Sequence, residues 1–196
     1  MRYDWETLYA GLHDCKNCGL SAGRTHVVIG DGNPKAKIML IGEGPGRDED
    51  LQGIPFVGAA GKLLDKMLAT IKLDRSEVYI ANIVKCRPPQ NRTPAEDEAL
   101  ACLPYLRAQA ALVKPAVIVC LGATAARYVY DKNVRITRDR GIWKYSKGIW
   151  ILPTYHPAAL LRDESKKREA WDDLKKLRAK YEELFPEYAS KGGGRG

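Results

Sequence analysis

Four of the five cysteines in the chain have a spacing that suits a shared metal centre. Cys15 and Cys18 form a Cys-x-x-Cys pair, whose two sulfurs can reach one metal ion or cluster. Cys86 follows an apolar segment, and Cys102 lies on the apolar side of an expected helix. Four thiolates suit either tetrahedral Zn²⁺ or an iron–sulfur cluster, and the spacing leaves both open. His13, close before Cys15, could replace one of the sulfurs.

Polar and glycine-rich residues follow four apolar segments that we expect to be buried strands. These segments are residues 37–42, 78–83, 116–122 and 149–154. The letters GEGPG accompany the end of the first segment, Asn82 lies within the second, and His156 comes just after the fourth. The carboxyl ends of parallel strands meet at one edge of a sheet, where ligands usually bind. The sequence therefore predicts a polar site at that edge.

The segments between these strands have helical patterns. Residues 58–71 place their apolar side chains on one face, and the letters TPAE at 93–96 are typical of a helix start with Pro94 at the first helical position. Strands that alternate with helices form right-handed crossovers and a parallel sheet covered on both faces. We therefore expect the α/β class, as a three-layer α/β/α sandwich with a central, mostly parallel four-stranded sheet. Cys120 belongs to the core of this sheet rather than to the metal centre.

The composition fits one globular domain with a basic surface. Of 196 residues, 45% are hydrophobic, and 32 Lys and Arg against 24 Asp and Glu give a net charge of +8. This hydrophobicity excludes a disordered chain, and no apolar run approaches the ~18 residues of a membrane span. The N-terminus lacks a signal-peptide pattern, so we expect a cytoplasmic protein that binds a polyanion and no membrane. We expect a single domain over residues 1–190 and a disordered tail over 191–196.

Much of the basic surplus lies in residues 132–147. Six cations, among them Arg138 and Arg140, stand there against a single acidic residue. Trp143 and Tyr145 alternate with these cations. Such a segment suits a surface that holds phosphates and stacks on bases. Taken alone, the pattern fits better with a solvated β-hairpin whose tryptophans face the core.

Four short motifs follow one another in a specific order: GEGPG, PFVGAAG, NIVKCRPPQNR and HPAALL. Together with the cysteine spacing, they resemble the family 4 uracil-DNA glycosylases, the iron–sulfur branch of the uracil-DNA glycosylase superfamily. The resemblance covers the chain from residue 15 to about residue 162. It implies an α/β/α sandwich and the removal of uracil from single- or double-stranded DNA. It also implies one 4Fe–4S cluster, held by Cys15, Cys18, Cys86 and Cys102.

Three side chains would recognise a uracil that has been flipped out of DNA. The resemblance implies that Phe56 stacks on the base. The Asn82 amide carries a donor and an acceptor that can pair with uracil O4 and N3–H, whereas cytosine presents the reverse pattern. His156 would donate a hydrogen bond to O2, where negative charge develops as the glycosidic bond breaks. Taken singly, Phe56 could also be a core residue, and Asn82 could simply end its strand.

The glycine-rich segment after the first strand completes the predicted pocket. The resemblance places Gly42, Glu43 and Gly44 beside the base and the attacking water. It places Glu49 where a side chain closes off the 5-methyl group of thymine, and Asn91 as a further active-site residue. Family 1 glycosylases carry an acidic side chain at the position of Gly44, so the motif names no general base here. We expect the electrophilic sugar cation to make a strong base unnecessary.

Contacts to DNA are expected from the segment after the histidine and from several arginines. By the spacing of the superfamily, Leu160 is the apolar wedge that enters the duplex where the base leaves. Leu161 flanks it, or is a core residue at a helix start. Arg47 stands in a stretch that is usually acidic in this family, and we expect it near the entrance, on a phosphate. The expected DNA-binding residues are Leu160, Leu161, Arg162, Arg47, Arg138 and Arg140.

These inferences predict a DNA repair enzyme that works as a monomer. It hydrolyses the N-glycosidic bond of uracil, releases the free base and leaves an abasic site. One alternative is a protein that captures uracil-containing DNA without turnover, covalently through a histidine on an inserted basic loop. Another is a zinc-stabilised nucleic-acid-binding domain. The segment between Cys86 and Cys102 has neither a histidine nor an insert, which argues against covalent capture.

Overall fold

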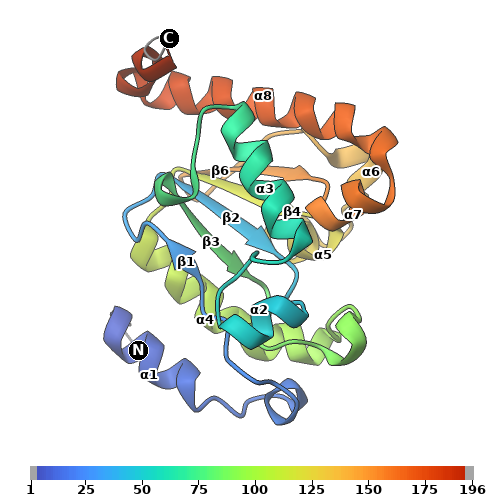
Figure 1. Cartoon of the computed structure of the whole chain (residues 1–196). Helices are drawn as coiled ribbons and strands as arrows, with labels where there is room; N and C mark the ends of the chain where they lie inside the picture. The colour runs from blue at the N-terminus through green and yellow to red at the C-terminus, as the bar shows by residue number, and fades with distance from the viewer. Residues whose placement is uncertain (1–3, 193–196) are drawn as a thin grey trace.

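The computed structural model describes residues 4–192, which are built around a central sheet (Figure 1). Within these residues, six strands pair in the order β1-β3-β2-β4-β6-β5. The strands are β1 (Asp31–Gly32), β2 (Ile38–Gly42), β3 (Val78–Asn82), β4 (Val117–Leu121), β5 (Lys144–Ser146) and β6 (Ile149–Thr154). The α-helices are α1 (Trp5–His13), α2 (Arg47–Gln52), α3 (Ala59–Thr70), α4 (Glu96–Val113), α5 (Ala123–Val129), α6 (Ile136–Asp139), α7 (Pro157–Arg162) and α8 (Lys167–Leu184). Short 3₁₀ helices are η1 (Gly19–Ala22), η2 (Arg75–Glu77), η3 (Pro89–Asn91), η4 (Glu164–Lys166) and η5 (Pro186–Gly192).

The four expected strands, β2, β3, β4 and β6, run parallel at the centre of the sheet. Leu40 of β2 pairs with Ile80 on one side and with Val119 on the other. Every residue of β2, β3 and β4 is buried, as expected of strands covered on both faces. The predicted sheet of four strands was too small, because β1 and β5 add antiparallel edges. With two residues, β1 is too short for a hydrophobic pattern to indicate it, whereas β5 belongs to the hairpin expected from the basic segment.

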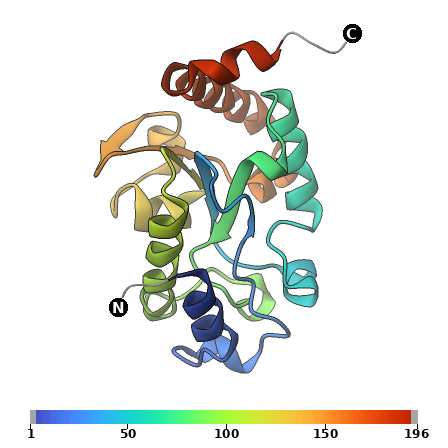
Figure 2. The same ribbon diagram turned by 90° about the vertical axis from the view of Figure 1, so that its left-hand side faces the viewer.

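Helices cover both faces of the sheet, which confirms the three-layer sandwich (Figure 2). Helices α3, α7 and α8 pack on one face, through side chains such as Leu68, Leu160 and Leu177. Helices α4 and α5 pack on the other face, through side chains such as Leu103 and Ala126. Helix α1 lies outside the sandwich and packs against α4. The sheet is therefore closed on both faces, and only its strand ends lead to a site.

Helix α4 begins at Glu96, later than the TPAE pattern predicted. The Glu98 carboxylate reaches back to the residue before the helix and accepts the Ala95 backbone N–H at 2.7 Å. The same carboxylate accepts two hydrogen bonds from Arg92. Thr93 therefore does not cap the helix, because Glu98 holds the chain at its start from within the first turn.

The basic segment 132–147 ends in the hairpin of β5 and β6, which confirms the hairpin interpretation. Much of its charge is paired within the protein. Arg138 bonds Asp139, and Arg140 bonds the fully buried Asp173 through two hydrogen bonds of 3.0 and 2.9 Å. The expected phosphate contact of Arg140 is thereby corrected, because its guanidinium is engaged inside the protein.

The C-terminal residues and the membrane-spanning potential of the helices bear on two further expectations. Helix η5 includes residues 191 and 192, which are the first two of the expected disordered tail. Residues 193–196 of that tail lie outside the described residues. Among the helices of residues 4–192, none has both the length and the apolar character needed to cross a bilayer.

The Asp173 network predicts a large effect on stability. Asp173→Ala would remove the buried carboxylate partner of the Arg140 guanidinium, which is only 16% exposed, and leave it the longer 3.9 Å pair with the half-exposed Glu169. It would also free the Thr154 hydroxyl that now donates to Asp173. Breaking a buried pair in this way should lower the free energy of unfolding by about 3 kcal/mol and Tm by roughly 10 °C. Thermal and urea unfolding measure the change.

The neighbouring Asp172→Ala is the matched control. The Asp172 side chain is 51% exposed and pairs with the exposed Lys175, so its loss should change stability by less than about 1 kcal/mol. Equal losses of stability in the two variants would contradict the structural role given to Asp173.

Candidate active site

A pocket of about 540 Å³ opens at the carboxyl ends of the parallel strands. Its walls come from the segments after β2, β4 and β6, from the end of β3, and from the loop between α2 and α3. The predicted site residues that line it are Glu43, Gly44, Glu49, Phe56, Asn82, Asn91, His156 and Arg162. The structure therefore brings together residues as far apart in the sequence as Glu43 and Arg162, at the edge where the parallel topology predicted a site.

Asn82 closes the inner end of this pocket. It is 1% exposed, and its Oδ1 is the one buried side-chain polar atom in the described residues that has no hydrogen-bond partner. Gly42 lies opposite Asn82 in the strand register. A Cβ on Gly42 would lie 2.4 Å from Asn82 Oδ1 and 2.6 Å from Phe56 Cζ. Gly42 therefore does not line the pocket with a side chain, but its lack of one lets the amide and the ring approach each other.

Phe56 and His156 face each other across the pocket wall. Their ring centroids lie 5.5 Å apart with an interplanar angle of 31°. His156 ends the segment after β6, and its Nδ1 accepts the Ala158 backbone N–H of α7 at 3.1 Å. Since Nδ1 accepts, the neutral ring carries its proton on Nε2. Burial of the ring and, as a smaller cause, the positive charge of Arg162 together lower the pKa of His156 to about 4, so the ring is neutral at pH 7.

The Glu49 carboxylate accepts hydrogen bonds from three backbone N–H groups. Oε1 accepts the N–H groups of Val57 and Gly58, each at 2.9 Å, and Oε2 accepts that of Gly46 at 3.1 Å. The side chain thus lines the pocket and also ties the GEGPG turn to the loop that carries Phe56. The resemblance assigned it only the first of these tasks.

Glu43 has a partner that the sequence did not indicate. Thr124, at the start of α5, donates a short hydrogen bond from its hydroxyl to Glu43 Oε2, and both residues line the pocket. No motif marked Thr124, because its importance comes only from the meeting of the β2 and β4 ends. Asn91 lies at the exposed rim, where its Oδ1 accepts a hydrogen bond of 2.8 Å from Arg87 Nε.

The segment after His156 differs from the expected wedge. Leu160 is 1% exposed and packs in the core, whereas Leu161 is 47% exposed. Leu161 therefore projects from the surface, whereas the predicted wedge, Leu160, does not. The α7 helix explains the difference, since its inward face must cover the sheet. Arg162 lies on the pocket rim, and Arg47 is exposed at the first position of α2.

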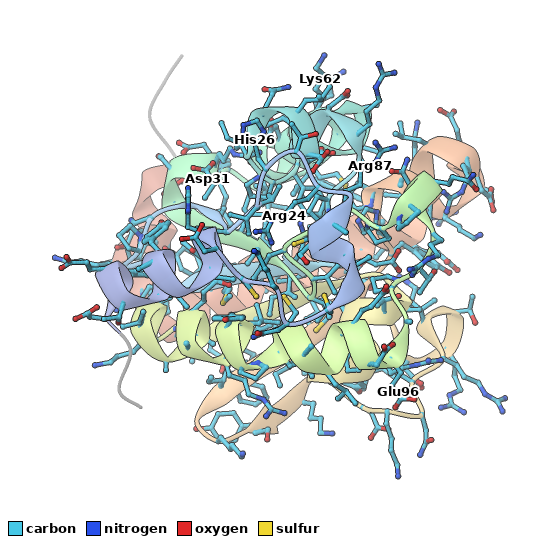
Figure 3. The ribbon with its side chains drawn as sticks, turned by 90° about the horizontal axis from the view of Figure 1, so that it is seen from below. Arg24, His26, Asp31, Lys62, Arg87 and Glu96 are labelled. Carbon is cyan, nitrogen blue, oxygen red and sulfur yellow. The ribbon has the colours of Figure 1, made fainter. Side chains whose placement is uncertain are left out.

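The four predicted ligand cysteines line one small cavity. Figure 3 shows sulfur atoms, in yellow, gathered beside the labelled Arg24. Arg24 Nη1 donates to Cys86 Sγ at 3.2 Å and to the Cys15 carbonyl at 2.9 Å. Burial raises the pKa of Cys86 and raises that of Cys102 to about 11. Among the described residues, no group of three or more His, Cys, Asp or Glu side chains is arranged to hold a metal ion.

Two other candidates stay outside this cavity. His13 is 81% exposed at the side chain, pairs with Asp14, and is not among the residues that line the cavity. The geometry gives no support to His13 as a replacement ligand. Cys120 is fully buried in β4, which confirms its expected place in the core.

Short connections link the cysteine cavity to the pocket. The residue after Arg24 begins a turn whose backbone amides, at Thr25 and His26, donate to the buried Asp50 carboxylate at 2.9 and 3.4 Å. Asp50 belongs to α2, directly after Glu49. On the other side, Lys85 lies between Asn82 and Cys86 in the chain, and its Nζ donates to the Asn82 carbonyl at 2.8 Å.

Comparison with known proteins identifies the family. The model of the uracil DNA glycosylase superfamily matches residues 29–175. The type-4 uracil-DNA glycosylase of Sulfurisphaera tokodaii is 49% identical over 173 residues, which are 84% of this chain and 79% of the relative. The type-4 enzymes of Thermotoga maritima and Archaeoglobus fulgidus are 46% and 45% identical, over 84% and 85% of this chain and 88% and 87% of their own. The chain therefore belongs to the type-4 family of the uracil-DNA glycosylase superfamily.

Proposed function

We propose that the protein excises uracil from DNA by hydrolysis of the N-glycosidic bond, releasing free uracil and leaving an abasic site. The observation that carries this proposal is the unpaired Oδ1 of Asn82 in a pocket bounded by Phe56 and His156. A buried acceptor without a donor is unfavourable, so it is expected where a ligand supplies the donor. The N3–H group of a flipped uracil is such a donor.

The Asn82 amide also discriminates between bases. Its oxygen accepts from uracil N3–H and its NH₂ group donates to O4. Cytosine would place an acceptor at N3 and a donor at C4, leaving polar groups unpaired in a buried site. Phe56 stacks on the face of the base, and Glu49 closes the side on which thymine carries its methyl group. The pocket volume of about 540 Å³ has room for one base with its sugar at the entrance.

His156 stabilises the leaving group. As the bond between N1 and C1′ breaks, electrons move onto the uracil ring and its O2 becomes negative. The neutral ring, with its proton on Nε2, donates a hydrogen bond to O2. Because the Ala158 N–H occupies Nδ1, the N–H at Nε2 is left to donate to a base in the pocket that His156 lines.

Water completes the reaction at the sugar. It adds a hydroxyl group at C1′ and gives up a proton, and uracil leaves with a proton on its ring. Glu43 and Gly44 lie beside this water in our proposal, with Thr124 holding the Glu43 carboxylate in place. Asn91 contributes from the rim, where Arg87 already engages its amide oxygen and leaves its NH₂ group to donate. No group is assigned as a strong base.

The surface around the pocket entrance binds DNA in this proposal. Leu161, rather than the buried Leu160, is the apolar wedge that replaces the flipped base in the stack. Arg162 and Arg47 contact phosphates on either side of the entrance. Arg138 is 64% exposed despite its pair with Asp139 and makes a more distant phosphate contact.

The cysteine cavity holds one 4Fe–4S cluster in our proposal. Cys15, Cys18, Cys86 and Cys102 would bind it. Among the described residues these side chains are not arranged to hold a single metal ion, but all four line one cavity, which supports a shared cluster. The buried thiols lose their protons on binding, so binding is coupled to proton release. The cluster serves as a structural crosslink between the N-terminal segment, the Cys86 loop and α4, with no redox step in excision.

The proposal includes the domain organisation, the oligomeric state and the cellular compartment of the protein. Residues 1–190 form one domain that acts as a monomer on single- or double-stranded DNA in the cytoplasm. The central sheet supports the domain assignment, because it includes strands from residue 31 to residue 154.

Excision is tested with an oligonucleotide that carries one uracil, followed by alkali. The wild-type protein should release uracil and produce strand scission at that position. Asn82→Ala should lower the single-turnover rate by at least about 100-fold, because the base loses its paired edge. Asn133→Ala, at an exposed amide between α5 and α6, is the matched control and should leave the rate unchanged. A stable protein–DNA adduct without release would instead support capture without turnover, and no reaction would contradict both.

The pH dependence of stability follows from His156. Its folded-state pKa of about 4 lies below the ordinary value of 6.5, so the folded protein favours the neutral ring. The resulting stability is fully present above pH 6.5 and is lost as pH falls toward 4, by up to about 3 kcal/mol. Urea unfolding between pH 7 and 4 should show a smaller decline for His156→Gln than for the wild type. The exposed His13→Gln should follow the wild type, and identical curves for all three would refute the assignment.

The cluster is tested by absorbance near ~400 nm, which iron–sulfur proteins show and zinc sites do not. Cys86→Ser should lose this absorbance and much of the soluble protein, while its remaining activity should still prefer uracil over thymine and cytosine. Cys120→Ala is the control, since Cys120 lies in the core and should leave the absorbance intact. One zinc ion per wild-type chain without the absorbance would overturn the cluster proposal.

A further inference from the structure

Phe56 has an unusual backbone conformation for an aromatic residue. Its φ is 55°, in the left-handed region that residues other than glycine rarely adopt. Such a conformation persists only where the surroundings hold it, and it is often found where a side chain must be aimed. The question is therefore what holds the Phe56 backbone in place.

Arg75 of η2 donates hydrogen bonds to two backbone carbonyl groups of the loop that carries Phe56. Its Nη1 donates to the Phe56 carbonyl at 2.9 Å, and its Nη2 makes a short hydrogen bond to the Pro55 carbonyl. Its Nε donates to Asp31 at 3.0 Å, and Nη1 also lies 3.4 Å from Asp65. Two carboxylates from β1 and α3 thus orient the guanidinium, whose planar fork then engages two successive carbonyls.

Glu49 holds the same loop by its amide groups. Its Oε1 accepts both the Val57 and the Gly58 N–H at 2.9 Å. The peptide group between Phe56 and Val57 is therefore held at its carbonyl by the cation Arg75 and at its N–H by the anion Glu49. Helix α3 adds a steric limit, because a Cβ on Gly61 would lie 1.8 Å from the Phe56 carbonyl oxygen.

We propose that Arg75 and Glu49 form a charged clamp that fixes the Phe56 ring in the position where it stacks on the flipped uracil. This inference rests on the proposed function. Arg75 does not line the pocket, so it is a positioning residue that acts through Phe56. Without the clamp, the loop relaxes from its left-handed conformation and the ring leaves its place 5.5 Å from His156.

The clamp predicts a specific kinetic pattern. A Phe56 ring that is already in place binds uracil without first being ordered. Loss of the clamp therefore weakens binding of the base in both substrate and product. Arg75→Met should therefore lower kcat/KM by about 10-fold and raise the inhibition constant of free uracil by a similar factor. Phe56→Ala, which removes the ring itself, should lower kcat/KM by about 5- to 100-fold.

A double-mutant cycle distinguishes this role from general stabilisation. If Arg75 acts through Phe56, Arg75→Met should change kcat/KM by less than about 2-fold in the Phe56→Ala background. If Arg75→Met costs the same factor with and without the ring, the clamp is refuted. Arg75→Lys provides a second cycle should the Met variant fold poorly, because lysine keeps the charge but lacks the fork that engages both carbonyls and Asp31.

Arg178→Met is the matched control. Arg178 also pairs with a carboxylate, Glu182, and donates to two backbone carbonyls, but it lies on α8 and away from the pocket lining. Its loss should lower Tm without changing uracil inhibition. Excision by the wild type together with an additive cycle would overturn the clamp alone, whereas a wild type that excises no uracil would overturn the proposed function itself.

Discussion

The parallel register between β2 and β3 is the constraint on which the rest of the site depends. It sets Gly42 opposite Asn82, and because Gly42 has no side chain, the Asn82 amide and the Phe56 ring can come together above it. The same parallel arrangement brings His156, after β6, to the same edge of the sheet. A shift of register by one residue would turn each side chain to the other face, so the buried strands that form the core also preserve the pocket.

Among residues 4–192, the buried polar and charged side chains have hydrogen-bond partners except at the one atom where a ligand is expected. Asp173 has Arg140 and Thr154, and Lys85 has Gln109 at 2.6 Å as well as a backbone carbonyl. In the segment between the cysteine cavity and α2, Arg24 donates to the Cys15 carbonyl and Asp50 accepts the Thr25 N–H. The walls of the pocket are thus held by hydrogen bonds that are complete without a ligand, and Asn82 Oδ1 is left as the open position.

Sequence patterns were sufficient for the central strands, the two helices that follow the first two of them and the order of the site motifs. They failed where the outcome depended on which neighbour a side chain would meet. Leu160 and Leu161 are identical in type, and only the direction of α7 decides that the first is buried and the second exposed. Arg140 belongs to a basic run, yet a carboxylate from α8 removes it from the surface. Thr124 and Arg75 carry no motif at all.

The sequence by itself determined the α/β class, the family and the residue types that meet at the strand ends, because hydrophobic periodicity and short ordered motifs are local properties. Only the tertiary structure decided which cations stay exposed, which leucine projects, and what holds Phe56 in a left-handed conformation. These depend on contacts between elements far apart in the chain, such as Arg75 with the Phe56 carbonyl and Glu49 with the Val57 amide. Such contacts are set by packing and desolvation, which no local pattern encodes.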